Sequence, residues 1–264
     1  MTRSVTPPRL TGLSPLSFVV WVAVAAVIIV SMGEVAPSPE RLAEGLPRMG
    51  NLIGRMMPPN TDPDFLARVF NRIVETFQIA LVGAAIGIAL SLPIAWLAAR
   101  GVSPLGPFSF AMKALVSLFR TVPDLIWALL FVVTVGLGAV AGTMTIIVDT
   151  IGFCGRFFAE AMEDAEKEPQ QALSAIGANR FGILTGAILP DAAPSMVNAG
   201  LFALEKAVRS SVVLGLVGAG GIGQELKVAF DLFQYQNAAT IILVIFAIVL
   251  VMEYLTDRLR ARLQ

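Results

Sequence analysis

Three long runs without a charged residue most constrain how this 264-residue chain can fold. They are Leu10–Gly33, Thr76–Ala99 and Leu232–Met252. A helix that crosses the hydrocarbon core of a bilayer needs about 20 apolar residues, and each run supplies that length. Charged residues make up 14% of the sequence, whereas soluble domains carry about 25%. We therefore expect an all-α polytopic membrane protein with a single integral-membrane domain over residues 1–264.

Positive charges indicate how many spans there are, because Lys and Arg gather in cytoplasmic loops. Arg3 and Arg9 predict a cytoplasmic N-terminus. Arg258 and Arg260 predict a cytoplasmic C-terminus, so the number of crossings is even. Glycines interrupt the uncharged region 125–148, which favours a turn with one span on each side of it. The expected spans are residues 12–33, 74–99, 111–136, 141–162, 192–216 and 233–256.

The segment 34–72 should lie outside, yet it holds five arginines, which the charge rule disfavours there. Apolar residues recur in it at helical spacing, at Leu42, Leu46, Met49, Ile53 and Met56. Beside them, Arg41, Arg48 and Arg55 recur every seven residues. This pattern predicts an amphipathic helix that lies against lipid in the membrane interface, with its arginines reaching water. An ordinary exposed loop is the alternative.

Several ionisable residues fall inside the expected spans, where each costs about 2.5–3.5 kcal/mol on insertion scales. Four-residue spacing lets Arg120 meet Asp124, and Glu205 meet Arg209, on one helix face. These faces either line a hydrated passage or hold helices together. For Lys206, the favoured interpretation is that its side chain reaches the interface. The candidate translocation-path residues are Arg120, Asp124, Asp149, Glu205, Arg209 and Ser210.

Glycines cluster at the end of the fifth expected span and just after it. Their spacing fits G-x-G-x-x-G, but that pattern marks a dinucleotide site only between a strand and a helix. No alternation of strands and helices surrounds it here. We expect a close-packed re-entrant turn that acts as a gate, formed by Gly218, Gly220, Gly221 and Gly223.

The composition excludes several classes of function. The formal net charge is zero, which gives no reason to expect a nucleic-acid partner. The chain has no His, and Cys154 is its only cysteine, so a Cys/His metal site and an intrachain disulfide are excluded. No catalytic constellation is present, and no G-x-x-x-x-G-K-[ST] loop could bind ATP. We therefore expect no catalytic residue, metal or cofactor in this chain itself.

A polar and helix-prone stretch, residues 160–190, interrupts this apolar sequence. Its charges cannot stay in hydrocarbon, so it must stand outside the lipid, where a soluble partner can reach it. Within it, Gln171-Ala172-Leu173 is followed by Gly177 and then by Leu189-Pro190. This spacing resembles the EAA loop of ABC-importer permeases, although Gln171 stands where that family has Glu.

Three other stretches narrow the resemblance. Residues Arg120–Phe131, the fifth-span sequence Val208–Gly223 and the double proline in Met57–Asn60 are similar to the phosphonate permease family. The similarity runs from about residue 55 to the C-terminus. Asp149 stands where relatives are expected to have His. The resemblance implies the type I ABC importer permease fold, with six transmembrane helices and a cytoplasmic coupling loop at residues 163–190.

The resemblance also implies partners and a mechanism. A short helix at about 170–176 would end at Gly177, Pro190 would start the return to the membrane, and an ABC ATPase dimer holding ATP and Mg would grip the loop. A second permease chain, most simply an identical one, and a soluble substrate-binding protein would complete an importer of phosphonate, phosphite or a related oxyanion in the bacterial cytoplasmic membrane. The residues implied to couple to the ATPase are Gln170, Gln171, Ala172, Leu173, Ala175, Ile176, Gly177, Ala178, Leu189 and Pro190.

Two other functions stay open at this point. The first is an ABC permease for another solute such as methionine, because methionine importers share a similar glycine turn. The second is an ion-coupled secondary transporter that uses the intramembrane carboxylates. That transporter would have no use for the polar stretch 160–190.

Overall fold

The computed structural model describes residues 15–36 and 38–263, so the predicted roles of Arg3 and Arg9 lie outside the described residues. Within those ranges the regular structure is entirely helical, as predicted. The chain divides into two compact units, residues 1–54 and residues 55–264, and each is described by itself.

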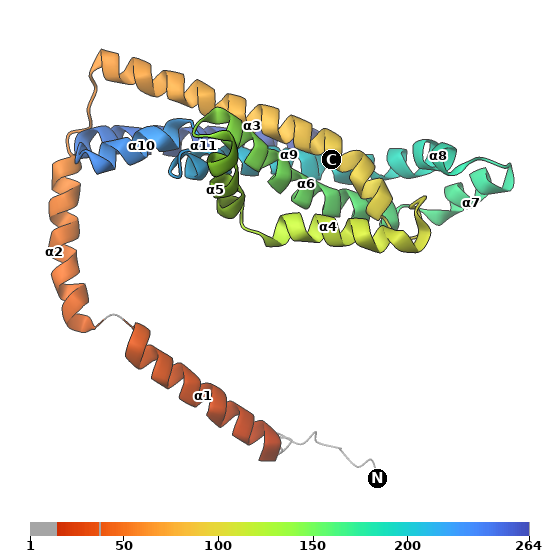
Figure 1. Cartoon of the computed structure of the whole chain (residues 1–264), viewed down its shortest axis with the longest axis horizontal. Coiled ribbons are helices and arrows are strands. Elements are labelled where there is room, and N and C mark those ends of the chain that lie inside the picture. Colours follow the sequence, from red (N-terminus) through yellow and green to blue (C-terminus); the bar gives the residue numbers. More distant parts are fainter. Residues whose placement is uncertain (1–14, 37, 264) are drawn as a thin grey trace, which may run out of the picture. The chain divides into compact units, whose positions relative to one another are not determined.

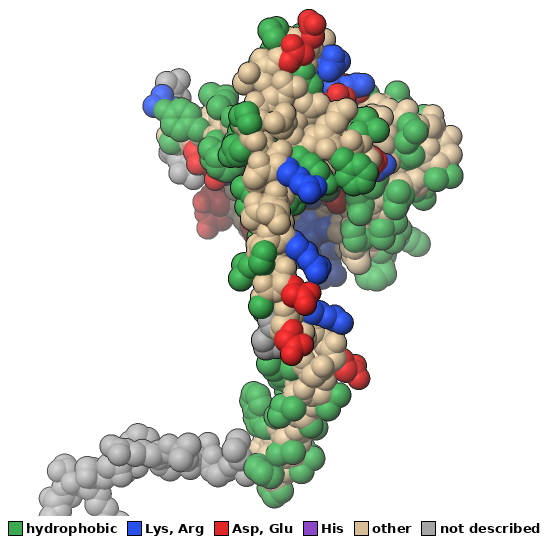
Figure 2. Space-filling view, turned by 90° about the vertical axis from the view of Figure 1, so that its left-hand side faces the viewer, with side chains coloured by type: hydrophobic (Ala, Val, Ile, Leu, Met, Phe, Trp, Pro, Cys, Tyr) green, Lys and Arg blue, Asp and Glu red, His purple; other side chains and the backbone are tan. Residues whose placement is uncertain are grey.

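The first unit carries two helices, α1 (Pro15–Val35) and α2, which spans Pro39–Met56 and so runs two residues past the unit's end. No residue of α1 is buried, and its apolar length suits a membrane span. Helix α2 realises the amphipathic pattern, with Leu46 and Met49 exposed on one side and an Arg48–Glu44 ion pair of 3.1 Å on its surface. In Figure 2, charged side chains of both signs follow α2 while hydrophobic side chains dominate α1.

The second unit is a bundle of long helices joined by short ones. Its elements are α3 (Pro63–Ala98), η1 (Gly106–Phe108), α4 (Ser109–Thr121), α5 (Asp124–Val135), α6 (Ala139–Asp164), α7 (Lys167–Ala175), α8 (Arg180–Ile183), η2 (Leu184–Ile188), α9 (Leu189–Gly215), α10 (Ile222–Asp231) and α11 (Tyr235–Leu263). Figure 1 shows α7 and α8 at one end of this bundle and α10 at the other.

Five helical stretches among the described residues are long and apolar enough to cross a membrane. They are Pro15–Val35, Pro63–Ala98, Ala139–Asp164, Arg180–Gly215 and Tyr235–Ala261. A sixth span would be the bent pair of η1–α4 with α5, so six crossings need that pair to count as one. Helix α3 begins eleven residues before the expected start at residue 74, because Pro63 suits a first helical turn and the polar residues that follow continue as helix.

The expected straight span at 111–136 is wrong in one respect: α4 and α5 meet at 89°. The break falls at Val122, whose ψ of 121° is extended, and at Pro123. A residue that precedes proline is disfavoured in helical backbone, and Pro123 cannot donate the hydrogen bond that would continue α4. The helix therefore breaks at Val122-Pro123, although the apolar character of the sequence continues through this point and suggested one helix.

The core lies where α3 crosses α6. A Cβ added at Gly83 would stand 2.7 Å from Ile146 Cγ2, and one added at Gly87 would stand 2.5 Å from Thr150 Cβ. Such glycines let two helix backbones approach closely, which is the main source of helix association in lipid. Ile146 and Thr150 are almost fully buried. Helix α9 packs against both α3 and α6, and this trio holds the loops at the two ends of the bundle.

Candidate functional site: the α7 loop and the charged face of α9

Helix α7 (Lys167–Ala175) starts three residues before the predicted coupling helix at about 170–176, and Ile176 is its C-cap. It ends as expected at Gly177, whose φ of +84° is the left-handed conformation that glycine adopts without strain. Ala178 N donates to Leu173 O and Gly177 N donates to Ser174 O, each at 3.0 Å. These two bonds form a Schellman motif, which satisfies the last carbonyls of the helix and fixes the turn.

The chain returns to the bundle earlier than predicted. Asn179 Oδ1 accepts from Gly182 N at 2.7 Å and caps a helix that starts at Arg180. That helix continues through a π-helical turn into α9, so Pro190 lies within an unbroken stretch instead of starting it. Pro190 fits there because it occupies the first turn of α9 next to the π-turn, where its missing N–H costs little.

The α7 loop packs against the bundle on one side and is exposed on the other. Leu173 packs close to Gly186 of η2, since a Cβ there would stand 3.2 Å from Leu173 Cδ1. Glu166 N donates to Asp191 Oδ2 at 2.8 Å, which ties the start of α7 to α9. By contrast Ile176 is 80% exposed at the tip, although it is a large apolar residue. A rigid helix with an exposed apolar tip suits contact with another protein.

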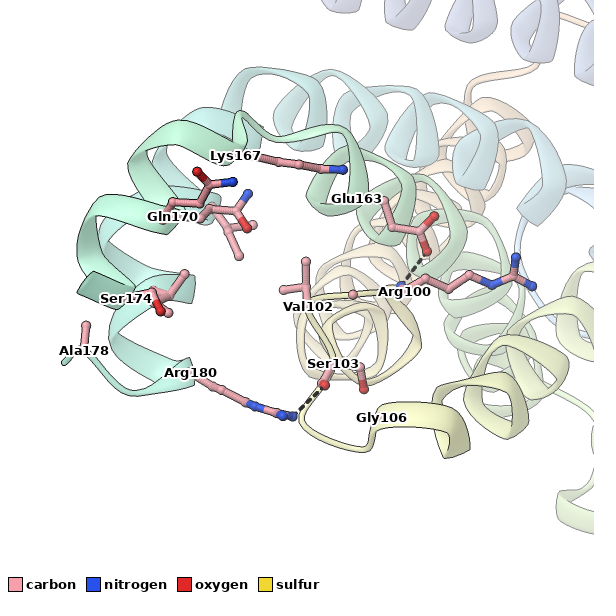
Figure 3. A pocket seen from close by; sticks show the side chains of 14 residues that line it. Arg100, Val102, Ser103, Gly106, Glu163, Lys167, Gln170, Ser174, Ala178 and Arg180 are labelled. Atoms are coloured by element: carbon pink, nitrogen blue, oxygen red, sulfur yellow. Dashed lines mark hydrogen bonds between the residues drawn. The ribbon is translucent and has the colours of Figure 1, made fainter. Parts of the chain in front are cut away.

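A cavity of about 720 Å³ separates α7 from the loop that joins α3 to α4. Figure 3 shows Lys167 at one rim of this gap and Arg180 at the other, both extending from the α7–α8 side toward the α3–α4 loop. Arg180 Nη1 donates to Ser103 O at 3.0 Å, and Glu163 accepts from Arg100 N at 2.8 Å. The charges of residues 160–190 predicted only that this stretch lies outside the lipid. Nothing in its spacing indicated that they surround one cavity.

The predicted pair on α9 is present: Arg209 Nη2 lies 2.8 Å from Glu205 Oε1. The other oxygen of Glu205 lies 3.1 Å from Arg260 Nη2 on α11. Glu205 is thus a bridge between two helices as well as an intrahelical partner. Its side chain is only 12% exposed.

The predicted pair of Arg120 with Asp124 does not form. The corner at Pro123 puts the two residues on different helices, so the four-residue spacing no longer brings them together. Asp124 Oδ2 instead accepts from Ser210 Oγ of α9 at 3.0 Å. Among the described residues the guanidinium of Arg120 has no ion-pair partner, and the residue is exposed.

The prediction that the Lys206 side chain extends to the membrane interface is also wrong, because this side chain contacts α6 directly. Its Nζ lies 2.7 Å from Asp149 Oδ1 on α6 and 5.6 Å from the centre of the Phe153 ring. This pair neutralises Asp149, whose side chain is 17% exposed. Asp149, Glu205, Arg209 and their partners therefore connect α6, α9 and α11, and the spacing along one helix could not reveal contacts between helices.

The glycine turn has the predicted close-packed form. Gly218, Gly220 and Gly221 all have positive φ, and Gly218 O accepts from Gly138 N at 2.9 Å. Gly223 is the second residue of α10 and lies against the carbonyl of Val212 so closely that a Cβ would collide with it. The turn is buried against the start of α6, at the opposite end of the bundle from α7.

Comparisons with known proteins agree with this architecture. A family model described as the binding-protein-dependent transport system inner membrane component matches residues 91–264. The phosphite transport system permease protein PtxC of Stutzerimonas stutzeri is 36% identical over 220 residues, which cover 83% of this chain and 79% of PtxC. The phosphate-import permease protein PhnE of Mycolicibacterium smegmatis is 38% identical over 209 residues, which cover 79% of this chain and 39% of that relative.

A solved structure supports the same assignment at the level of fold. A chain in the inward-facing MetNI methionine ABC transporter superposes with a TM-score of 0.66 at 23% identity, covering 77% of this chain and 100% of that one. This match confirms the predicted ABC-importer permease fold. The 36% identity with PtxC shows that the similarity also holds at the level of sequence. This protein belongs to the family of binding-protein-dependent transport system inner-membrane components.

Proposed function

We propose that this chain is the membrane-spanning subunit of an ATP-driven importer. It would pass phosphonate, phosphite or a related oxyanion from a soluble binding protein to the cytoplasm. Family membership supports the transport role, and the relatives named for phosphite and phosphate import support the substrate class. The MetNI match is a likeness of fold alone and carries no preference for methionine.

The observation that carries the proposal is the geometry of α7. This helix is exposed, has a fixed C-terminal turn and is attached to α9 through Glu166 and Asp191. A partner that displaces α7 would therefore move α9, which carries Arg209 and Ser210. ATP closure of two ATPase subunits gripping two copies of the loop would switch the pore between its two open states by a hinge-and-shear motion.

The charged face of α9 suits an anionic cargo. Arg209 is 58% exposed despite its contact with Glu205, so it can form further hydrogen bonds to an oxyanion. Arg120 lies in the last turn of α4, and Asp124 on the other side of the α4–α5 corner accepts a hydrogen bond from Ser210 of α9. We infer that these groups offset the charge of the cargo as it passes.

The assembly would be a homodimer of this chain in the bacterial cytoplasmic membrane, with both termini inside. One ATPase dimer would bind inside and one binding protein outside. ATP and Mg would be held by the ATPase, not by this chain.

Reconstitution tests the proposal. The experiment uses proteoliposomes that contain this chain and its ATPase, with the binding protein added. They should take up radiolabelled phosphite only when ATP is present on the side of the membrane where the ATPase is bound. Unlabelled methylphosphonate should compete, and methionine should not. Uptake of methionine alone would replace the substrate assignment, whereas uptake that persists without ATP on an ion gradient would refute the importer class.

A further inference from the structure

One face of α7 carries a row of hydrogen-bond donors that faces the 720 Å³ cavity. Lys167, Gln171 and Ser174 follow one another at four- and three-residue spacing, which places them on one side of the helix. All three line the cavity, and Figure 3 shows Lys167 and Ser174 on that side. Arg180 supplies a fourth donor from the opposite rim.

The other face of α7 has a different character. Ala172 and Ile176 are exposed and lie roughly opposite the donor row at helical periodicity. An ATPase that grips this apolar face would leave Lys167 and Ser174 free, on the side of α7 that lines the cavity. The two faces can therefore serve two different ligands at once.

The donors facing the cavity are uncommitted. Within the described part of the chain, the Lys167 ammonium, the Gln171 amide and the Ser174 hydroxyl make no hydrogen bond. Arg180 uses one N–H on Ser103 O and keeps the others available. Gln170, in contrast, already donates to Ala165 O and Glu166 O. The cavity is thus lined by hydrogen-bond donors whose N–H and O–H groups have no bonded acceptor or have some N–H groups left over. Two of these donor groups, on Lys167 and Arg180, are cationic.

The single carboxylate in the lining does not oppose a bound anion. Glu163 Oε1 lies 3.0 Å from Lys113 Nζ and accepts from Arg100 N, so its charge is compensated. The guanidinium of Arg100 points away from α7, and the cationic groups that count are Lys167 and Arg180 (Figure 3). Both cations extend from the α7–α8 side toward the α3–α4 loop (Figure 3), and each could form a charge-assisted hydrogen bond to an anion in the cavity.

We propose that this cavity binds a phosphate-type oxyanion between α7 and the α3–α4 loop. A tetrahedral anion offers several acceptor oxygens to the donors that line this cavity. Bound there, it would tie the α7 loop to the loop that already holds Arg180 through Ser103. Its chemistry is that of free phosphate, phosphonate or phosphite, and equally that of a lipid headgroup phosphate.

The functional meaning rests on the proposed function. If the importer delivers such an oxyanion to the compartment that α7 faces, the site senses its product. An occupied site would restrain the helix that the ATPase must move, and import would slow as product accumulates.

Equilibrium binding of radiolabelled inorganic phosphate to the intact protein tests the site. The protein is measured once in delipidated detergent micelles and once in nanodiscs that contain phosphatidylglycerol. Saturable binding is expected in micelles, with Lys167→Gln/Arg180→Gln weakening it about tenfold or more. Gln171→Glu should also weaken phosphate binding, because it adds a carboxylate to the donor row.

Lys227→Gln is the matched control. It removes one exposed cation from α10, at the far end of the bundle, and phosphate binding should be unchanged. If phosphate binds in micelles but not in nanodiscs with phosphatidylglycerol, and the Lys167→Gln/Arg180→Gln variant loses both ligands, the lipid headgroup is the natural occupant of the same site. The absence of saturable binding in either arm, or an equal loss in the control, overturns the site.

The outcome separates this site from the proposed function. Phosphate binding without phosphite uptake would refute the importer assignment and leave the site intact. Normal uptake by a protein that binds no phosphate would refute only the site.

Discussion

Glu205 links the charges of α9 to the rest of the bundle. One of its oxygens contacts Arg209 on the same helix, and the other contacts Arg260 on α11. A carboxylate with 12% of its side chain exposed keeps its charge inside a membrane protein only when cations surround it. Removing one of the two arginines leaves the other in place, so function can be tested without unfolding the protein.

Arg209→Ala should abolish ATP-driven uptake while the protein stays folded and bound to its ATPase. The loss arises because the exposed guanidinium no longer offsets the cargo's charge, whereas Arg260 still neutralises Glu205. Phosphite uptake into proteoliposomes and co-elution with the ATPase measure the two effects. Arg156→Ala is the control, since it breaks a comparable pair with Glu160 at 2.7 Å. Uptake by Arg209→Ala at the normal rate would show that this side chain has no role in the path.

Lys206→Met should destabilise the protein by about 1–3 kcal/mol, because Asp149 would lose its partner inside the membrane. The double variant Lys206→Met/Asp149→Asn should recover most of that loss, since no uncompensated charge remains. Thermal unfolding in detergent measures both. A double variant no more stable than the single one would mean that the loss does not come from an unpaired charge on Asp149.

Residue spacing alone could predict only part of this network. The contact between Glu205 and Arg209 follows from helix periodicity, and it is confirmed. The contacts of Glu205 with Arg260 and of Asp149 with Lys206 join helices that are far apart in sequence, so they depend on helix packing. Arg120 was paired wrongly with Asp124 because the helix was assumed to continue through Pro123.

Among the elements, α7 follows most directly from local sequence. Gly177 supplies the left-handed residue, and Asn179 supplies the cap of the next helix, so both ends of the turn are encoded within three residues. The sequence also contained the signal for the α4–α5 corner in Val122-Pro123. The uninterrupted run of apolar residues on both sides of Pro123 nevertheless led to the prediction of one continuous helix. The π-turn before α9 has no local signature that would have placed it.

Gly177→Val should cost about 1–2 kcal/mol in the stability of the α7 turn, because a side chain is strained at φ +84°. The space around Gly177 is open, so the strain comes from the backbone alone. Uptake and ATPase binding should both fall as the turn loosens. Gly54→Val is the matched control, since it adds the same side chain in equally open space on α2 without a positive φ. Wild-type coupling in Gly177→Val would show that the turn geometry is dispensable.

At the scale of the whole molecule, the helix order puts α7 and the α10–α11 connection at opposite ends of the bundle. The positive-charge pattern predicts which end is cytoplasmic. The only cysteine, Cys154, is fully buried, so the native protein gives a clean background for thiol labelling.

Ile176→Cys should react with a membrane-impermeant maleimide only in inside-out vesicles. Leu232→Cys, at the far end and 59% exposed, should react only in right-side-out vesicles. The native protein should stay unlabelled in both preparations. Labelling of Ile176→Cys from the outer side would reverse the orientation and remove the ATPase from the mechanism.

The corner between α4 and α5 has a consequence for water. At 1.5 Å per residue, each arm is about 20 Å long or less, and the hydrocarbon it would have to cross is about 30 Å thick. If the bent pair crosses the bilayer as one span, the backbone at Val122 and Pro123 leaves helical geometry inside the hydrocarbon, where lipid cannot satisfy it. Asp124 and the solvent-exposed Arg120 flank that point. The backbone groups freed at this corner must therefore either be buried against other helices or be reached by water from a cavity.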